Sequence, residues 1–136
     1  MTTARLPQEI RPALDNGVPA LMVTCSADGT PNVTVISQVH YVDETHVALS
    51  FQFFNKTIKN VRENPRAWTG LMDFIGRADW TLDLEFERSE VEGPIFDAMD
   101  MQIEAIASAT GMSGIFKLRG ADIYRVLSVE KRPYQQ

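Results

Sequence analysis

The sequence of 136 residues contains a single cysteine, Cys25, so no disulfide bond can form within the chain. This is typical of a protein kept in a reducing compartment. No apolar run approaches the roughly 20 residues that a membrane-spanning helix needs. The opening segment, "MTTARLPQEIRPALDNG", also lacks the apolar centre of a signal peptide. We therefore expect a soluble cytoplasmic protein without a membrane partner.

Positive charge is also scarce, since 13 Lys and Arg residues face 18 Asp and Glu residues and the formal net charge is -5. A general nucleic-acid binder would carry a basic surface, so we expect no nucleic-acid partner. Hydrophobic residues make up 44% and charged residues 23% of the chain, an ordinary globular composition. The length predicts one domain over residues 1–136.

The first half of the sequence predicts one short helix and three strands. Leu6, Ile10 and Leu14 recur at helical spacing, and "DNGVP" ends that helix. The predicted strands are "ALMVTC" (residues 20–25), "NVTVISQV" (32–39) and "HVALSF" (46–51). The dipeptide Asp28-Gly29 indicates a tight hairpin between the first two strands. "HYVDET" is read as a second turn, so the three strands would form an antiparallel meander.

The second half predicts three more strands and a longer helix. Strands are expected at residues 67–72, 79–87 and 123–129, with a turn around Gly76 and a bend at Gly120. The strand 79–87 alternates, with Trp80, Leu82, Leu84 and Phe86 on one face and Thr81, Asp83, Glu85 and Glu87 on the other. The helix begins at Pro94, stops at Gly111 and carries an apolar stripe of Phe96, Met99, Ile103 and Ile106. About six mostly antiparallel strands with two or three helices predict a mainly β fold, a closed or nearly closed barrel.

The segment "NKTIKNVRENPR" (residues 55–66) predicts a helix whose first turn carries a cation. Helix N-termini favour anions, so Lys56 stands at an unfavourable place. Asn55 is a good N-cap residue, and the free amides, the Thr57 hydroxyl and the Lys56 ammonium group would converge on one spot. That combination suits a bound phosphate. A solvated basic face of Lys56, Lys59 and Arg62 is the alternative.

The order of strand, Asp-Gly turn, strand, strand and "FNKTIKNVRENPRAW" resembles the flavin-binding family related to pyridoxamine 5'-phosphate oxidase. The similarity runs from about Leu14 to Val129, and its most specific part is the helix that ends in "NPR". The resemblance implies a six-stranded antiparallel split β-barrel of the FMN-binding type. It also implies a homodimer with FMN in clefts between the two subunits.

The resemblance places the cofactor site on three segments. The start of the helix would hold the FMN phosphate, the second strand would lie along the isoalloxazine ring largely through backbone groups, and the strand before the helix would complete the site. Thr34 stands where the oxidases often carry a phosphate-binding arginine. The implied cofactor-binding residues are Val35, Ile36, Ser37, Gln38, Ser50, Phe51, Asn55, Lys56 and Thr57.

The expected function is that of an FMN-dependent oxidoreductase that passes hydride or electrons between a nicotinamide donor or another small molecule and its flavin. Nothing in "EKRPYQQ" matches the C-terminal Trp, Arg and His residues of the vitamin B6 oxidases, so we do not expect that reaction. No side chain stands out as a catalytic acid, base or nucleophile. A non-catalytic flavin-binding or sensing module, or a relative that uses deazaflavin or haem, remains the alternative.

Other reactive residue types receive structural interpretations. His40 and His46 flank a turn without helical spacing or a nearby Cys pair, so we expect surface histidines and no metal site. Cys25 is interpreted as a small core residue. Asp83, Glu85 and Glu87 are expected to face water, and Trp68 and Trp80 to act as core or interface anchors.

Overall fold

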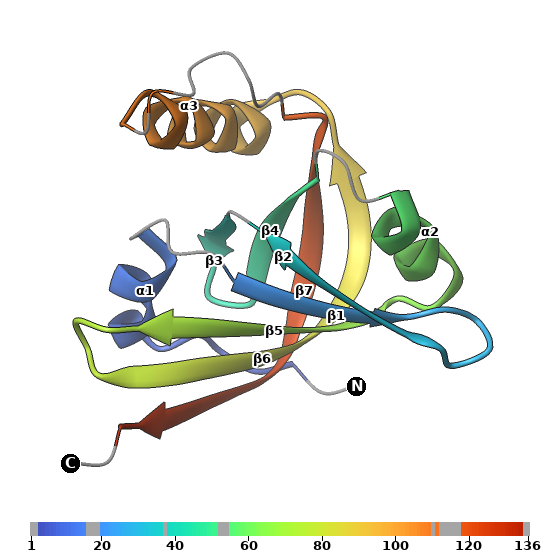
Figure 1. The fold of residues 1–136 in the computed structure, drawn as a ribbon, viewed down its shortest axis with the longest axis horizontal. Coiled ribbons are helices and arrows are strands. Elements are labelled where there is room, and N and C mark those ends of the chain that lie inside the picture. The colour runs from blue at the N-terminus through green and yellow to red at the C-terminus, as the bar shows by residue number, and fades with distance from the viewer. Residues whose placement is uncertain are drawn as a thin grey trace.

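The computed structural model describes residues 3–15, 20–36, 38–51, 55–109, 111 and 118–134, and within these ranges it leaves out the side chains of residues 51, 55–58 and 106. Strands dominate, as predicted, and helices pack around them (Figure 1). In chain order the elements are η1 (Gln8–Ile10), α1 (Arg11–Asp15), β1 (Ala20–Cys25), β2 (Pro31–Ile36), β3 (Val39–Asp43), β4 (His46–Phe51), α2 (Asn55–Glu63), β5 (Arg66–Asp73), β6 (Ala78–Glu90), α3 (Pro94–Ala109) and β7 (Gly120–Pro133).

The described strands form one antiparallel sheet of seven, in the order β2-β1-β5-β6-β7-β4-β3. The sheet curls so far that its edge strand β2 contacts β4 without a hydrogen-bonded ladder between them. A curled sheet that leaves this seam unpaired is a split barrel, which confirms the predicted fold class. The expected number of six strands was one too low.

The missed strand is β3, which begins inside the segment predicted to be a turn. The predicted strand 32–39 is broken: β2 ends at Ile36 and pairs with β1, whereas Val39 opens β3 and pairs with Leu49 of β4. The true turn is the shorter one that follows Asp43. The predicted meander is therefore wrong, because β2 and β3 lie at opposite edges of the sheet.

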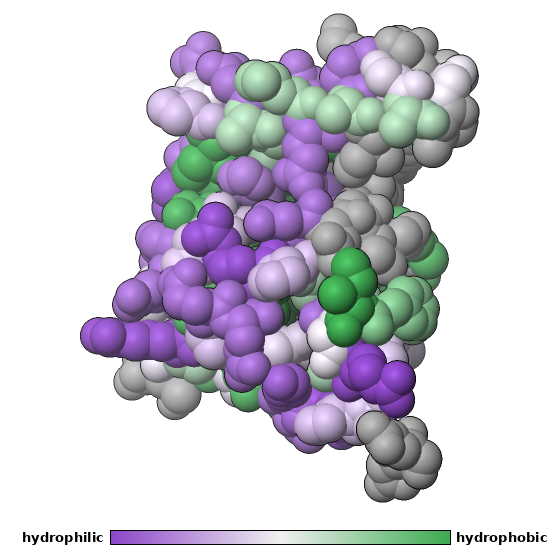
Figure 2. All heavy atoms as spheres, turned by 90° about the vertical axis from the view of Figure 1, so that its left-hand side faces the viewer, coloured by the Kyte–Doolittle hydropathy of each residue, from purple (hydrophilic) through white to green (hydrophobic). Residues whose placement is uncertain are grey.

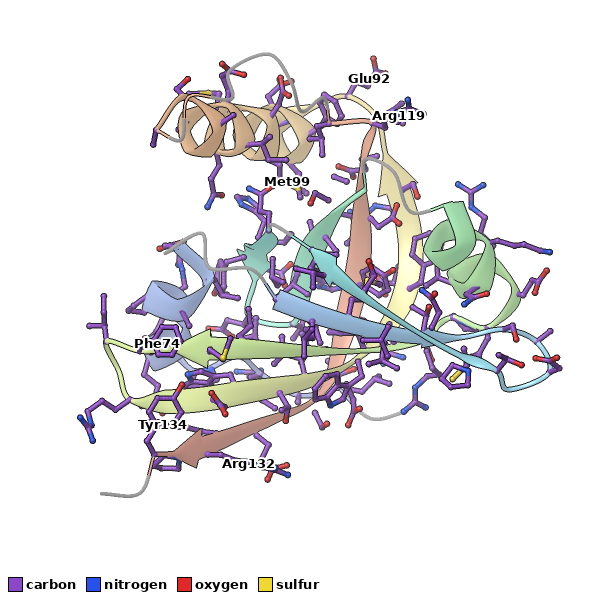
Figure 3. All side chains as sticks on the ribbon, in the orientation of Figure 1. Phe74, Glu92, Met99, Arg119, Arg132 and Tyr134 are labelled. Carbon is purple, nitrogen blue, oxygen red and sulfur yellow. The ribbon has the colours of Figure 1, made fainter. Side chains whose placement is uncertain are left out.

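Two apolar clusters lie on the two sides of the sheet. The larger one fills the inside of the curl, where Trp80, Leu82 and Leu84 of β6 are buried as their alternation predicted. The N-terminal segment adds Leu6, η1 adds Ile10 and α1 adds Leu14 to the same cluster. The smaller cluster lies between α3 and the outer face of β4 and β7, and Figure 3 shows Met99 pointing from α3 toward the sheet.

The hairpin between β1 and β2 has the predicted turn chemistry. Gly29 adopts φ 88°, which a residue without Cβ tolerates best. Its amide donates to the carbonyl of Ser26 at 2.9 Å, and the Ser26 amide donates to the carbonyl of Thr30 at 3.0 Å. This turn fixes the register of β2 against β1, with Leu21 opposite Val35.

Candidate functional site

The split of the barrel brings together the segments that the sequence assigned to a cofactor. β2 packs against both β4 and α2, and β4 leads directly toward the start of α2 (Figure 1). Among the described strands β2 pairs with β1 alone, so its backbone groups on the other edge remain available to a ligand. Ser37 lies outside the described residues, so its predicted contact stays a prediction.

Consecutive residues of β2 point to opposite faces, which limits what its side chains can do. Val35 is 60% exposed, whereas Ile36 is 1% exposed and packs in the larger core cluster. Only the backbone of Ile36 is therefore left for a cofactor. Thr34 is partly exposed.

Two buried polar atoms, where β3 begins and β4 nears its end, have no hydrogen-bond partner. They are Oε1 of Gln38 and Oγ of Ser50, in residues that are 2% and 1% exposed. Val39 pairs with Leu49 in an antiparallel register. Gln38 comes just before Val39 and Ser50 just after Leu49, so Gln38 and Ser50 lie opposite each other. A buried polar group without a partner costs about 1–3 kcal/mol, so a further polar partner at this corner would be stabilising.

The other end of the Gln38 amide is held. Its Nε2 donates to Oε1 of Gln102 on α3 at 2.6 Å. Burial lowers the pKa of the nearby His40, and a hydrogen bond with the same Gln102 opposes that shift. The sequence did not point to Gln102, because no spacing pattern connects a residue of α3 with strands that lie far away in the sequence.

The first turn of α2 lies at the residues predicted to bind phosphate. Asn55, Lys56 and Thr57 open the helix, and no acidic residue stands in its first turn. The amides of a first turn have no partner within the helix and attract anions. The side chains of these three residues lie outside the description, and so does that of Phe51, whose backbone pairs with Gly120 of β7.

The sequence reasoning also missed a buried carboxyl group beside this region. Asp122 of β7 is 5% exposed, pairs with Leu49 of β4 and accepts a hydrogen bond from Oγ of Ser89. Burial raises its pKa from 3.8 to about 6, which the Ser89 bond and Arg62 of α2 oppose. Tyr124, two residues further on, has a raised pKa because it is buried and close to Asp122. The alternation of Asp122, Tyr124 and Val126 along the last strand could have placed Asp122 on the inner face.

The two histidines lie in strands rather than on an open surface, so that expectation was wrong. His40 is half-buried in β3. His46 begins β4, where Nε2 bonds Glu87 at 2.8 Å and Nδ1 bonds Asp43 at 3.0 Å. Within the described part of the chain, no group of three His, Cys, Asp or Glu residues is placed to hold a metal ion.

The acidic stripe of β6 is partly engaged instead of simply facing water. Asp83 accepts a hydrogen bond from Ser128, and Glu85 forms an ion pair with Arg125 of β7 at 2.8 Å. Glu87 lies 4.0 Å from the same guanidinium group. These contacts link β6 to β7, so the stripe has a structural role in the sheet.

A broad apolar surface lies on the outer side of β2, β1 and β5. We call this surface the apolar face. Cys25, which was predicted to be a core residue, lies at the end of β1 beside this face and is only partly buried. The indole of Trp68 lies over Gly70, where an added Cβ would be 2.8 Å from the ring. Hollows of about 280 and 200 Å³ flank this indole. The apolar face consists of Leu21, Val23, Val33, Val35, Trp68 and Met72.

Another side of the molecule, to the left in Figure 1, is more polar. Figure 2 shows mostly hydrophilic side chains on the face below α3, with hydrophobic residues toward both its left and its right side. Phe74 and Ile75, in the turn between β5 and β6, are 64% and 80% exposed. Figure 3 places Phe74 at the same end of the molecule as Tyr134 and Arg132. Among the described residues, no helix is both long and apolar enough to cross a lipid bilayer.

Comparison with known proteins supports the resemblance seen in the sequence. Residues 6–118 match the family model described as pyridoxamine 5'-phosphate oxidase. An uncharacterized protein of Methanocaldococcus jannaschii is 33% identical over 67 residues, which is 48% of this chain and 44% of that protein. The chain thus spans less than half the length of this curated relative.

Solved structures with low sequence identity share the fold. An FMN-binding protein of Syntrophomonas wolfei is similar with a TM-score of 0.74 at 14% identity, covering 94% of this chain and 87% of that one. An F420 reductase gives 0.66 at 13% identity, covering 92% and 98%. The haem storage protein HutZ of Vibrio cholerae gives 0.58 at 18% identity, covering 97% and 92%.

Proposed function

Because the chain belongs to the pyridoxamine 5'-phosphate oxidase family, we propose that it is an FMN-binding oxidoreductase that works as a homodimer. FMN, when bound, supplies hydride or electron transfer through its ring. The protein supplies placement, local electrostatics and exclusion of water. A small-molecule substrate or a nicotinamide donor is the proposed reaction partner.

The observation that carries this proposal is the pair of unpartnered polar atoms at Gln38 and Ser50. Native proteins rarely leave such atoms buried without a partner. They lie where β4 leads toward α2, the segment proposed for the phosphate, and beside the free edge of β2. The residues present therefore fit a cofactor with a polar ring edge at one end and an anion at the other.

The predicted residues divide into a group for the phosphate of FMN and a group for its ring. The first turn of α2 (Asn55, Lys56 and Thr57) holds the phosphate with its amides, and Lys56 adds a full positive charge. Residues 35–38 lie along the ring, mainly through backbone groups. Ser50 and Phe51 close the site from β4.

The homodimer forms through the apolar face. Val33 and Val35 are 63% and 60% exposed, and Leu21 and Met72 are nearly half exposed. Exposed apolar patches of this kind mark interaction sites. Val35 belongs both to this face and to the proposed cofactor segment, so a second copy docked here would cover the ring. We assign no catalytic side chain.

A visible spectrum of the purified protein tests the cofactor class. Oxidised FMN, deazaflavin and haem have different absorption bands, and a non-catalytic flavin module would keep its flavin oxidised with NADH, NADPH and other donors. Bleaching of a bound FMN by one of these donors, followed by turnover with an acceptor, supports the oxidoreductase. A purified protein that takes up haem but no FMN contradicts the proposal.

The first prediction concerns Lys56. Lys56→Ala should weaken FMN binding by about 1.5–3 kcal/mol, the range for a hydrogen bond to a charged group. The folding of the flavin-free protein should barely change. Titration of FMN against quenching of its fluorescence measures the affinity. Lys59→Ala is the matched control, because Lys59 is an exposed lysine on the same helix beyond its first turn. Equal affinity in wild type and Lys56→Ala would remove the phosphate role.

A further inference from the structure

The amide of Gln38 has a fixed direction. Its Nε2 donates to Oε1 of Gln102 at 2.6 Å, whereas its own Oε1 is buried without a partner. An amide turned by 180° would bring its oxygen against the oxygen of Gln102, which repels it. The contact with Gln102 therefore leaves a hydrogen-bond acceptor, and not a donor, directed away from α3.

Gln102 is held in place by its helix. His40 of β3 lies beside it, and Gln102 opposes the lowering of the His40 pKa that burial causes. α3 is anchored on the sheet because Met99 and Ile103, on either side of Gln102 in the sequence, are buried against Ala48, Ala121 and Ile123. Gln102 thus accepts the hydrogen bond from Gln38 on an anchored helix and lies close to the start of β3.

We infer that Gln102 is a positioning residue that turns the carbonyl oxygen of Gln38 toward the cofactor, where it accepts a hydrogen bond from a ring N–H group. The inference rests on the proposed function. Beside this acceptor, the unpartnered hydroxyl of Ser50 can donate to a carbonyl oxygen. An N–H group next to a C=O group is the imide edge of an isoalloxazine or deazaflavin ring. The perimeter of a haem carries no such edge, so α3 selects for the flavin type of cofactor.

The experiment compares FMN affinity and the visible spectrum of bound FMN in wild type, Gln102→Leu, Gln38→Leu and the double variant. Gln102→Leu should weaken FMN binding roughly three- to tenfold, as the loss of one net hydrogen bond predicts. It should also shift the flavin bands, which a purely structural role would not do. Gln38→Leu should weaken binding to a similar extent. The double variant should be no weaker than Gln38→Leu, because Gln102 acts through Gln38.

Two further variants keep the result clear. Gln102→Glu retains an acceptor for Nε2 of Gln38 and should keep FMN affinity within about twofold of wild type. Met101→Leu is the control on the same helix, since Met101 is 75% exposed, and it should change nothing. Additive losses in the double variant, or unchanged FMN binding and spectrum in Gln102→Leu, would overturn the inference while leaving the proposed function standing. A wild-type protein that binds no FMN overturns both.

Discussion

Asp122 is a carboxyl group inside the curl of the sheet, and its ionisation couples stability to pH. Burial raises its pKa from 3.8 to about 6 in the folded protein. The folded state therefore binds the proton more tightly than the unfolded state does. The resulting stabilisation is fully present below pH 3.8 and is lost as the pH rises through about 6. At neutral pH the folded protein carries a buried carboxylate whose desolvation Ser89 and Arg62 offset in part.

Asp122→Asn should remove this penalty. A shift of about two pKa units corresponds to roughly 2–3 kcal/mol, so the variant should be more stable than wild type by up to that amount at pH 7–8. Near pH 4 the difference should be small, because Asp122 is protonated in the folded protein and about half protonated in the unfolded chain. The amide oxygen that this substitution introduces can still accept the hydrogen bond from Ser89.

Urea unfolding at pH 4, 6 and 8 measures the difference. Asp97→Asn, an exposed change from Asp to Asn on α3, provides the control. A wild type and Asp122→Asn pair with parallel stability curves over this pH range would disprove the linkage.

At the scale of elements, a buried side-chain hydrogen bond joins helix α2 to the sheet, in addition to apolar packing. Nδ2 of Asn60 donates to Oγ1 of Thr24 on β1 at 3.2 Å, and both residues are buried. Val61, the next residue of the helix, packs in the core. This contact sets the position of the helix whose first turn is proposed to hold the phosphate.

Asn60→Ala should lower the free energy of unfolding by about 1–3 kcal/mol, because it leaves the Thr24 hydroxyl buried without its partner. Thermal unfolding followed by circular dichroism provides the measurement. Glu63→Ala, an exposed change on the same helix, should have little effect. Thr24→Val in the Asn60→Ala background should restore part of the stability, and a further loss of equal size would contradict the explanation.

The elements that the sequence predicted well are those whose pattern is local. The alternation of β6 and the Asp-Gly turn after β1 depend on neighbouring residues alone, and both are confirmed. The break between β2 and β3 was missed because "NVTVISQV" reads as one uninterrupted β-prone run. Only the long-range pairing of Val39 with Leu49 shows that the chain leaves one edge of the sheet for the other.

The same limit applied to the candidate site. The start of α2 could be identified from the positions of Asn55, Lys56 and Thr57, because cap chemistry is local. Gln102 and Asp122 could not be connected to it, since they come from α3 and β7 and reach the region only through tertiary packing. Polar residues that meet across elements leave no spacing signature in one sequence.

At the scale of the whole molecule, β1 is largely apolar on both of its faces, and β2 is apolar on its outer face. Met22 and Ile36 point into the core, whereas Leu21, Val33 and Val35 point outward and are 47–63% exposed. Strands that are apolar on both faces are typical of sheets covered on both sides. One cover is the protein's own core, and the proposed second cover is another copy of the chain.

Leu21→Lys tests the proposed contact with a second copy directly. Leu21 lies between Val35 of β2 and Gly70 of β5, near the middle of the apolar face. A lysine there would be buried without a partner in the dimer, at a cost of about 3–5 kcal/mol, which raises the dissociation constant more than roughly 100-fold. Because the side chain is half exposed in the monomer, the fold itself should be retained. Light scattering coupled to size-exclusion chromatography should show a dimeric wild type and a monomeric variant at micromolar concentration.

Val91→Lys is the matched control, since Val91 is 66% exposed in the loop before α3, outside the apolar face. It should remain dimeric. If FMN bridges the two copies at Val35, the monomeric variant should also bind FMN more weakly, whereas Val91→Lys should not. A monomeric wild type, or a Leu21→Lys dimer as tight as wild type, would place the partner of these strands elsewhere. In that case the hollows on either side of Trp68 would face solvent, and the cofactor ring would have to be enclosed by one chain alone.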